Sequence, residues 1–367
     1  MKILITGSDG FIASNLTTEL KNRGYTDLFL FNHNTSEDEL KYFLSLCDTV
    51  IHLAGVNRPK ADDEFRKGNV EFTQKLLNYL ENRKTIPHII FASSIQAQLD
   101  NPYGRSKLEA ERILQQYANK KKSPLTIYRF PNVFGKWCKP NYNSVVATFC
   151  FNIAQNIEIQ VHDANKMISL VYIDDAVDSI IKSIEKPGDL CRPEVEPVYR
   201  VNIGTLAETI CSFKSLNDEL GIPNIKNDFT KKLYSTYLSY IAKDGLKYSL
   251  SMNKDNRGSF TEFLRKDGLG QISINITKPG IIKGNHWHHT KVEKFLVVSG
   301  RAVIRLRNKM TGKLIEFLVS GELLEVIDIP AGYVHSIANM GNEDLVTVMW
   351  ANETFDKENP DTYYEKV

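Results

Sequence analysis

The sequence lacks the features that mark secreted, membrane-spanning and disulfide-rich proteins. Its 367 residues include only five cysteines, and no two of them form a CxxC pair. Such thiols build no disulfide framework, so we expect a reducing, cytoplasmic compartment. No apolar run is long enough to span a bilayer. The apolar start, residues 1–7, is followed at once by glycine and charged residues, unlike a signal peptide.

An excess of charge of either sign is also missing. Lys plus Arg total 46 and Asp plus Glu total 44, for a net charge of +2. A balanced chain of this kind carries no broad electrostatic field, so we expect neither nucleic acid nor a membrane as a partner. Apolar content of 42% and charged content of 25% are typical of a soluble globular protein, and the length predicts two or three domains.

The chain changes its pattern near residue 245. Before that point, β-like apolar runs alternate with helical patterns, which predicts an α/β domain with a Rossmann-like, doubly wound parallel sheet. After residue 250, short alternating strands separated by turn residues predict an antiparallel all-β barrel or sandwich. We therefore expect two domains, residues 1–245 and residues 246–367.

Four residues of the second domain have the types and the spacing of a metal site. His286 and His288 are separated by one residue, so they project from the same face of a β-strand. Glu293 and His335 complete three imidazoles and a carboxylate, which suits a divalent transition metal, zinc above all. Half of the chain's eight histidines lie between residues 286 and 335, which favours a metal over scattered structural histidines.

This spacing resembles the two motifs of the cupin family, at residues 280–300 and 330–339. The one departure is Leu324, where the family has glycine. The resemblance implies a jelly-roll barrel around the metal. The pattern does not show which residue there moves a proton, and the candidates are His289, Lys294 and Tyr333. His289 is equally well an exposed residue or one that supports a ligand.

A glycine pattern after the first expected strand indicates a dinucleotide site. Gly7 and Gly10 are followed by Phe11 and Ile12, where a helix begins. The glycines allow a tight turn and a close approach of the backbone to a pyrophosphate, which then sits on the helix N-terminus. A turn into a helix often needs glycine in any case. Its place directly after a short strand makes cofactor binding the better interpretation.

Further motifs follow in order at residues 48–55, 91–94, 103–107, 129–135 and 171–175. Together with the glycine pattern they resemble the extended short-chain dehydrogenase/reductase family, which acts largely on nucleotide sugars. The resemblance implies cofactor contacts from Leu53 and Ala54. It also implies that Tyr103 and Lys107 form the YxxxK pair, and at i and i+4 they share one helical face.

These residue types suit proton transfer at a substrate oxygen. Lys107 beside the phenol favours the phenolate, so we expect it to lower the pKa of Tyr103. Tyr103 then exchanges a proton with the substrate, and the cofactor supplies the hydride. Ser94 matches the family's serine or threonine that hydrogen-bonds the same oxygen. Ser93 is the competing assignment and is expected to contact the substrate.

The end of the second expected strand bears on the choice of cofactor. Relatives that prefer NAD carry an acid there, which binds the ribose 2′-hydroxyl. This chain has Asn32, His33 and Asn34 instead, with no carboxylate among them, and this favours NADPH. The arginine that usually holds the 2′-phosphate is missing as well.

The contacts to the substrate are marked less clearly. The family often has an arginine for the nucleotide diphosphate four residues before the tyrosine of its last motif, and this chain has Ile168 there. Lys136 and Arg58 are the candidate replacements. Asn132 is also expected to contact the substrate.

Phrases at residues 54–59, 135–144 and 284–289 resemble bifunctional capsular polysaccharide enzymes that join both domains. The resemblance implies a UDP-2-acetamido-2,6-dideoxy-4-ketohexose as substrate and a route to UDP-N-acetyl-L-fucosamine. It implies epimerisation at carbon 3 in the cupin, then reduction at carbon 4 by NADPH to UDP-2-acetamido-2,6-dideoxy-L-talose. Chemistry requires this order, because the proton at carbon 3 is acidic only beside a ketone. We also expect a homodimer.

Two other interpretations remain open. The cupin could be a structural, dimerising module held together by zinc, which would leave a single reductase activity. The chain could instead be a regulatory sensor of sugar nucleotides without activity. Ser94, Tyr103 and Lys107 speak against a sensor, because binding alone does not require them.

Overall fold

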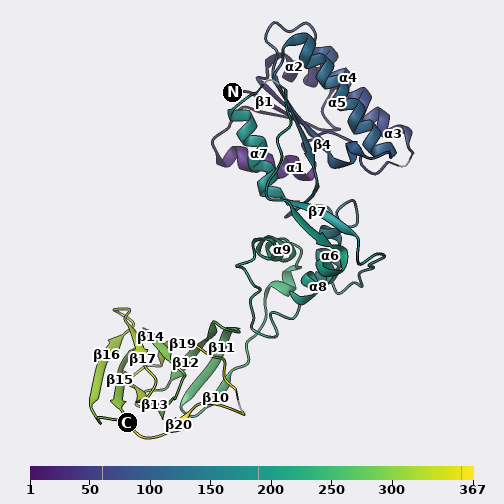
Figure 1. Ribbon diagram of the computed structural model, residues 1–367. Helices are drawn as coiled ribbons and strands as arrows, with labels where there is room; N and C mark the ends of the chain where they lie inside the picture. The colour runs from purple at the N-terminus through teal and green to yellow at the C-terminus, as the bar shows by residue number, and fades with distance from the viewer. Residues whose placement is uncertain (60, 189, 357) are drawn as a thin grey trace. The chain divides into compact units, whose positions relative to one another are not determined.

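The computed structural model describes residues 1–59, 61–188, 190–356 and 358–367. They form two compact units (Figure 1). The first consists of Met1–Phe213 and Lys226–Ala242, and the second of Lys214–Ile225 and Lys243–Val367. The segment Lys214–Ile225 interrupts the first unit, a detail that composition does not reveal. Among the described residues, no helix combines the length and apolarity needed to cross a bilayer.

The first unit is built on a parallel sheet of six strands in the order β2-β1-β3-β4-β5-β8. The strands are β1 (Ile3–Thr6), β2 (Leu28–Phe31), β3 (Thr49–His52), β4 (His88–Ser94), β5 (Leu125–Phe130) and β8 (Leu190–Cys191). Helices cover both faces, so strands β1 and β3 are buried throughout. This arrangement confirms the Rossmann-like fold class. The strand order reverses between β1 and β3, which is where ligands bind in such sheets.

Two helical layers flank this sheet (Figure 1). Helices α1 (Phe11–Asn22) and α7 (Ile173–Glu185) pack on one face through a shared apolar core. On the other face lie α2 (Glu37–Leu46), α4 (Phe72–Leu80) and α5 (Pro102–Lys121). The helical segment before β4 is divided into α3 (Asp63–Phe65), a π-helical turn (Arg66–Glu71) and α4.

A smaller part of the first unit lies outside the main sheet and has a sheet of its own. Its three-stranded sheet has the order β6-β7-β9, with β6 (Asn132–Phe134), β7 (Met167–Tyr172) and β9 (Tyr199–Asn202). Helices α6 (Val145–Ala154), α8 (Ile203–Ser212) and α9 (Asp228–Leu238) contact one another beside it.

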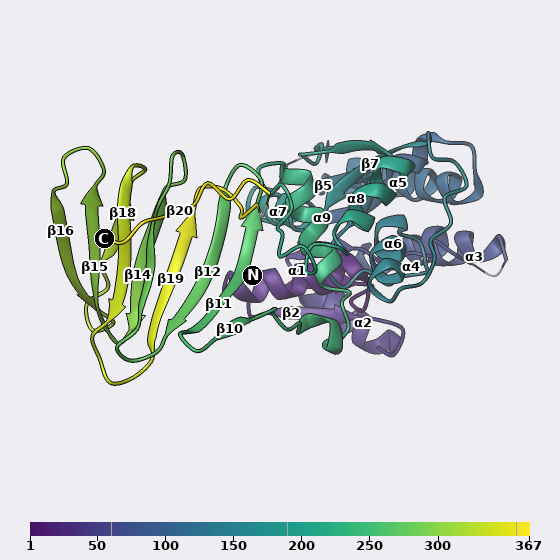
Figure 2. The ribbon, with the colours of Figure 1, turned by 90° about the horizontal axis from the view of Figure 1, so that it is seen from below.

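The second unit contains two antiparallel sheets, which confirms the all-β prediction (Figure 2). One has the order β10-β11-β12-β19-β14-β17 and the other β16-β15-β18-β13-β20. The strands of the first sheet are β10 (Asn253–Asp255), β11 (Gly258–Lys266), β12 (Gly270–Thr277), β14 (Glu293–Ser299), β17 (Val326–Ile329) and β19 (Leu345–Ala351). Those of the second are β13 (Ile282–Trp287), β15 (Arg301–Asn308), β16 (Leu314–Ser320), β18 (Tyr333–Asn339) and β20 (Tyr363–Tyr364).

The core of this unit lies between its two sheets. Phe295 and Val297 come from one sheet and Ile304 and Ile337 from the other, and all four are buried in one cluster. Because side chains alternate along each strand, every second residue of β14 and β18 points into this interior. His335 is two residues from Ile337, so it shares the inner face.

Candidate active sites

The glycine-rich loop of the first unit leaves no room for side chains. Gly7 has φ +71°, and a Cβ there would lie 2.8 Å from the Ala54 backbone that follows β3. Gly10 begins α1, and no side chain caps that end of the helix. The backbone N–H groups of the first turn therefore remain available to an anion. A bare loop against an uncapped helix fits a dinucleotide pyrophosphate.

A cavity of about 510 Å³ lies beside the ends of β2 and β3. Its walls are Phe31, Ala54, Gly55, Val56, Glu64, Lys67, Gly68 and Phe72. Ala54 is thus placed as expected for a cofactor contact. The side chains of Phe11, Ile12 and Leu53 pack against the core of the sheet and are partly buried, so their cofactor contacts remain predictions.

The end of β2 differs from the expectation drawn from its sequence. Asn32 and His33 follow the strand, but the carboxylate of Asp9 reaches them from the glycine-rich loop. Asp9 Oδ1 accepts a hydrogen bond of 2.9 Å from Asn32 Nδ2. The residues adjacent in sequence include no carboxylate, as predicted, but the fold brings one here from another loop. The preference for NADPH remains a prediction. Asn34 turns back, its N–H donating to Asn32 Oδ1 at 2.9 Å.

Helix α5 positions the YxxxK pair. Its start is well defined, because Asn101 accepts a hydrogen bond of 2.8 Å from Gly104 N and Pro102 occupies the first turn. One turn into the helix, Lys107 is buried and its Nζ donates to Ala92 O at 2.9 Å. Burial lowers the pKa of Lys107 to about 8, against the raising effect of Glu111. The lysine is therefore held on the end of strand β4.

The pKa of Tyr103 is raised, which corrects the expectation that Lys107 would lower it. Burial is the main cause, and a hydrogen bond with Ser94 acts in the opposite direction. Burial raises a phenol pKa because it disfavours the charged phenolate. Tyr103 thus carries its proton at neutral pH, the form needed to donate to an oxygen.

The two serines at the end of β4 have different environments. Ser93 is buried, and its hydroxyl donates to Glu111 Oε1 at 2.5 Å. Arg129 holds the same carboxylate, with 2.7 Å between Nη2 and Glu111 Oε2. Ser93 is therefore engaged in the interior, and the substrate contact assigned to it finds no support. Ser94, on the other side of the strand, accepts from Gln96 N and reaches Tyr103.

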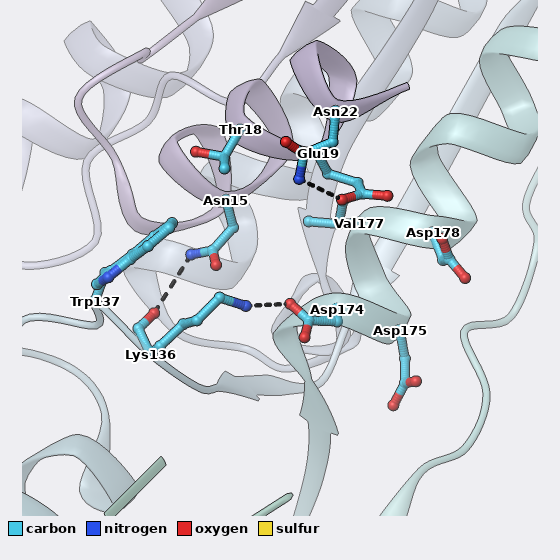
Figure 3. Close-up of a pocket in the computed structure, with 10 residues that line it drawn as sticks. All are labelled: Asn15, Thr18, Glu19, Asn22, Lys136, Trp137, Asp174, Asp175, Val177 and Asp178. Carbon is cyan, nitrogen blue, oxygen red and sulfur yellow. Dashed lines mark hydrogen bonds and ion pairs between the residues drawn. The ribbon is translucent and has the colours of Figure 1, made fainter. Parts of the chain in front are cut away.

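Lys136, a candidate contact to the substrate diphosphate, already has a partner of opposite charge. Lys136 pairs with Asp174 at 2.5 Å, and its carbonyl accepts from Asn15 Nδ2 (Figure 3). Lys136 and Asp174 line a pocket of about 370 Å³ together with Glu19, Asp175 and Asp178. Lys136 is thus engaged by Asp174, and its contact to a diphosphate remains a prediction.

Two further residues expected to contact the substrate lie on the surface. Arg58 is exposed in the segment after β3. Asn132 is exposed too, and its amide donates to Ser169 O at 3.0 Å. The structure therefore leaves their roles as predictions.

In the second unit, the four expected metal ligands converge. His286, His288, Glu293 and His335 each offer one ligand atom, and these atoms all lie within 4.8 Å of one another. A bulge in β13 between Gly284 and His286 sets His286 opposite His335 of β18. Glu293 begins β14 in the facing sheet, and its Oε2 lies 3.0 Å from His335 Nε2.

Three polar atoms of this group are buried without a hydrogen-bond partner among the described residues: His288 Nε2, Glu293 Oε2 and His335 Nε2. Buried polar atoms are rarely left unpaired, because each costs on the order of 1–3 kcal/mol. Burial, with help from His335, lowers the pKa of His286 to about 4, which keeps this imidazole neutral as a ligand must be. The site therefore fits a divalent cation.

The segment after β13 is held by a residue that sequence analysis missed. His288 Nδ1 hydrogen-bonds the Asp361 carbonyl, which turns Nε2 toward the other ligands. The Asp361 carboxylate accepts N–H bonds from His289, Thr290 and Lys291, each 2.9 or 3.0 Å long. Seventy-three positions separate His288 from Asp361, so no local pattern reveals the contact.

The three candidates for proton transfer are separated by the structure. His289 packs against Trp287 and Tyr363, with ring centres 4.5 and 5.0 Å away, on the face opposite the ligands. Lys294 is exposed and pairs with Asp328. Tyr333 belongs to the inner face of β18, packed against the core between the sheets. Only Tyr333 shares the interior with the metal ligands.

Comparison with known proteins agrees with both units. The description "NAD dependent epimerase/dehydratase family" matches residues 3–204, more than half of the chain. The chain belongs to the NAD dependent epimerase/dehydratase family. Residues 253–363 match the "Polysaccharide biosynthesis C-terminal domain". The first unit carries Tyr103 and Lys107 on helix α5, as described above, and the second unit carries the candidate metal ligands.

Similar proteins cover the whole chain. The UDP-2-acetamido-2,6-beta-L-arabino-hexul-4-ose reductase of Pseudomonas aeruginosa is 42% identical over 99% of this chain and 98% of its own length. The crystal structure of the capsular polysaccharide assembling protein CapF from Staphylococcus aureus superposes with a TM-score of 0.94, at 48% identity, over 100% of both chains. The expected resemblance to capsular polysaccharide enzymes that join both domains is thereby confirmed. The UDP-N-acetylglucosamine 4-epimerase of Bacillus cereus, at 25% identity and TM-score 0.52, matches 59% of this chain and 82% of its own.

Proposed function

We propose that the chain is a bifunctional enzyme of capsular polysaccharide biosynthesis that acts in the cytoplasm on a UDP-2-acetamido-2,6-dideoxy-4-ketohexose. The second unit epimerises carbon 3, and the first reduces the ketone at carbon 4 to give UDP-2-acetamido-2,6-dideoxy-L-talose. One observation carries the two-step proposal. A complete Ser94–Tyr103–Lys107 set and a buried metal-ligand set of four residues occur in separate units of one chain.

The reductase residues suit the delivery of a proton. A nicotinamide cofactor supplies the hydride for carbon 4 when it is bound. Tyr103 keeps its proton at neutral pH because it is buried, so it can donate to the carbonyl oxygen as charge develops there. Ser94 hydrogen-bonds the phenol and is placed to orient the same oxygen. Lys107 adds a positive charge nearby, which favours the developing alkoxide.

The second unit suits removal of a proton from carbon 3. That proton is acidic because the carbanion is delocalised onto the neighbouring carbonyl oxygen as an enolate. We propose that His286, His288, Glu293 and His335 hold zinc, whose charge supplies electrostatic stabilisation of such an oxygen when it is bound. Tyr333, on the same inner face, is the residue that we propose moves the proton. Reduction follows, because it removes the ketone on which this acidity depends.

Isotope exchange tests the division of labour. Full-length Tyr103→Phe is incubated with the keto sugar in deuterium oxide, without nicotinamide. We expect deuterium at carbon 3 at the wild-type rate. In a separate assay with the nicotinamide cofactor, reduction by the same variant should fall by at least about a hundredfold. The variant His286→Ala with His335→Ala is the counterpart and should not exchange. Normal exchange in that variant would show that the second unit does no chemistry.

Such a result would favour the alternative function, a single-activity reductase whose second unit is structural and joins two copies of the chain. The buried ligand set by itself fits a structural ion as well as a catalytic one. The buried nitrogens His288 Nε2 and His335 Nε2, which lack hydrogen-bond partners among the described residues, suit an ion in both cases. The exchange experiment distinguishes these functions because only a catalytic site labels carbon 3.

A further inference from the structure

A fully buried carboxylate lies one turn beyond the YxxxK pair on helix α5. Glu111 is 0% exposed, and at i and i+4 it shares one face of the helix with Lys107. Lys107 Nζ donates to Ala92 O of strand β4 at 2.9 Å. Glu111 Oε1 accepts from the hydroxyl of the next residue, Ser93, at 2.5 Å. Two consecutive residues at the end of β4 are therefore tied to the same face of α5.

The buried carboxylate also has partners of opposite charge. Arg129 of β5 approaches both oxygens of Glu111, with Nε 2.9 Å from Oε1 and Nη2 2.7 Å from Oε2. Arg192, which is more exposed, lies 3.5 Å from Oε2. Taking a charge out of water costs several kcal/mol unless charged partners and hydrogen bonds compensate it. Glu111 therefore has the surroundings that a buried carboxylate requires, and it joins α5 to β4 and β5.

Lys107 has few groups around it that favour its positive charge. Burial lowers the pKa of Lys107 to about 8 even with the opposing effect of Glu111, so without this carboxylate the pKa would lie closer to neutrality. His52 of β3 is kept neutral by burial, which lowers its pKa to about 3. Tyr103 keeps its proton, and the Phe91 ring lies 4.8 Å from Lys107 Nζ. Among the described residues, Glu111 is the negative charge that supports this amine.

We propose that Glu111 is a positioning residue for the reduction: its charge keeps Lys107 protonated at neutral pH, and its bond to Ser93 fixes the strand end that carries Ser94. The inference deepens the proposed function, since it rests on reduction by Tyr103 and Lys107 in the first unit. Because Glu111 is fully buried, it acts through these neighbours and not on the substrate.

NMR titration of the full-length protein without nucleotide, labelled with carbon-13 at the lysine ε-carbons, tests the effect on Lys107. Its signal is the one missing from Lys107→Met, and in the wild type it should titrate near pH 8. Glu111→Gln keeps the shape and removes the charge, so the midpoint should fall by at least about 0.5, since a nearby opposite charge shifts a pKa by about 1–3. The pH at which kcat/KM for reduction falls should move down with it.

Two variants separate this role from a structural one. Ser93→Ala removes a donor but keeps the carboxylate, so it should destabilise the protein and leave the Lys107 midpoint near pH 8. Glu109→Gln removes an exposed charge from the same helix and should change neither quantity. If Glu111→Gln does not fold, the double variant with Arg129→Gln leaves no unpaired buried charge and should show the same lowered midpoint.

Melting curves establish that each variant is folded. An unchanged Lys107 midpoint in folded Glu111→Gln or in the double variant would overturn the assignment while leaving a reductase in place. An equal fall in Glu109→Gln or Ser93→Ala would do the same, because the effect would then not depend on the buried charge. If the wild type reduces no keto sugar with either nicotinamide cofactor, the proposed function itself is wrong.

Discussion

At the scale of single residues, adjacent positions at the end of β4 have opposite roles. Ser93 and Ser94 have the same chemistry, and the alternation of side chains along a strand sends them to different faces. Ser93 supplies one of the hydrogen bonds that the buried Glu111 carboxylate needs, and Ser94 contacts Tyr103. A buried carboxylate depends on every donor it has, whereas a half-exposed hydroxyl can be lost without strain.

Alanine substitutions should separate these two roles. Ser93→Ala is expected to reduce the free energy of unfolding by about 1–3 kcal/mol, because Glu111 loses a donor. Ser94→Ala should leave stability within about 0.5 kcal/mol and slow reduction. Denaturant unfolding and steady-state rates measure the two effects. A stability loss in Ser94→Ala without a rate effect would exchange the assignments.

Lys107 should give the reductase a pH limit. Its pKa is lowered to about 8 by burial, from an ordinary value of 10.5. As pH rises through 8 the positive charge is lost, so kcat/KM for reduction should fall. Over the same window the native state has released a proton that the unfolded chain keeps until about pH 10.5, so this group makes the protein more stable as pH rises.

Activity and stability should therefore move in opposite directions above pH 8, and this rules out unfolding as the cause of lost rate. The measurement is a pH–rate profile with unfolding curves at the same pH values. Lys107→Met should lower the rate at all pH values and remove the fall in kcat/KM near pH 8. If kcat/KM still falls near pH 8 in this variant, the fall is caused by the titration of another group.

At the scale of elements, the chain's last strand supports the metal site. β20 pairs with β13 at His286 and Trp287, and the turn before it places Asp361 under the segment 289–291. Three backbone N–H groups and one ligand imidazole are fixed by this single residue. A short terminal strand therefore determines the orientation of a ligand on another element.

Asp361→Ala removes the carboxylate that holds the N–H groups of residues 289–291 but keeps the carbonyl that bonds His288. Because that carbonyl is then less firmly positioned, metal binding should weaken by about 10-fold. The ligands themselves remain, so the metal should still bind at high concentration. Competition with a fluorescent chelator measures the affinity. Asp356→Ala is the control, because its carboxylate contacts only Glu358 and Asn359 among the described residues. Equal affinities of the two variants would contradict a supporting role for Asp361.

At the scale of the whole molecule, the two units have separate cores and separate sites. The main sheet of the first unit is buried between helices of that same unit. Under the proposed function, a labile keto sugar reaches both sites in order, which would give a chemical reason for their fusion. Damage to one site should therefore change the product and spare the other site.

The double variant His286→Ala with His335→Ala should bind nicotinamide with unchanged affinity, within about twofold. It should form either the carbon-3 epimer of the normal product or almost none, depending on whether reduction tolerates the uninverted ring. NMR of the product identifies the sugar, and calorimetry measures the cofactor. Normal product at the normal rate would refute epimerisation in the second unit.

The sequence by itself determined the local features. Hydrophobic periodicity identified the parallel and antiparallel domains, because the periods of helix and strand differ. A one-residue spacing placed His286 and His288 on one face, and a four-residue spacing aligned Tyr103 with Lys107. These features depend only on neighbours along the chain, so the pattern sufficed. Short motifs also identified the matching families.

Tertiary structure alone decided what depends on distant residues. It brought Asp9 to Asn32 and Asp361 to His288, directed Lys136 to Asp174, and raised the pKa of Tyr103 through burial. It also gave Ser93 and Ser94 different partners, and it placed Tyr333, but not His289 or Lys294, in the interior between the sheets. Electrostatic and hydrogen-bonding environments are set by atoms close in space. The fold alone brings such atoms together, so the support of a ligand imidazole could not be read from neighbours in sequence.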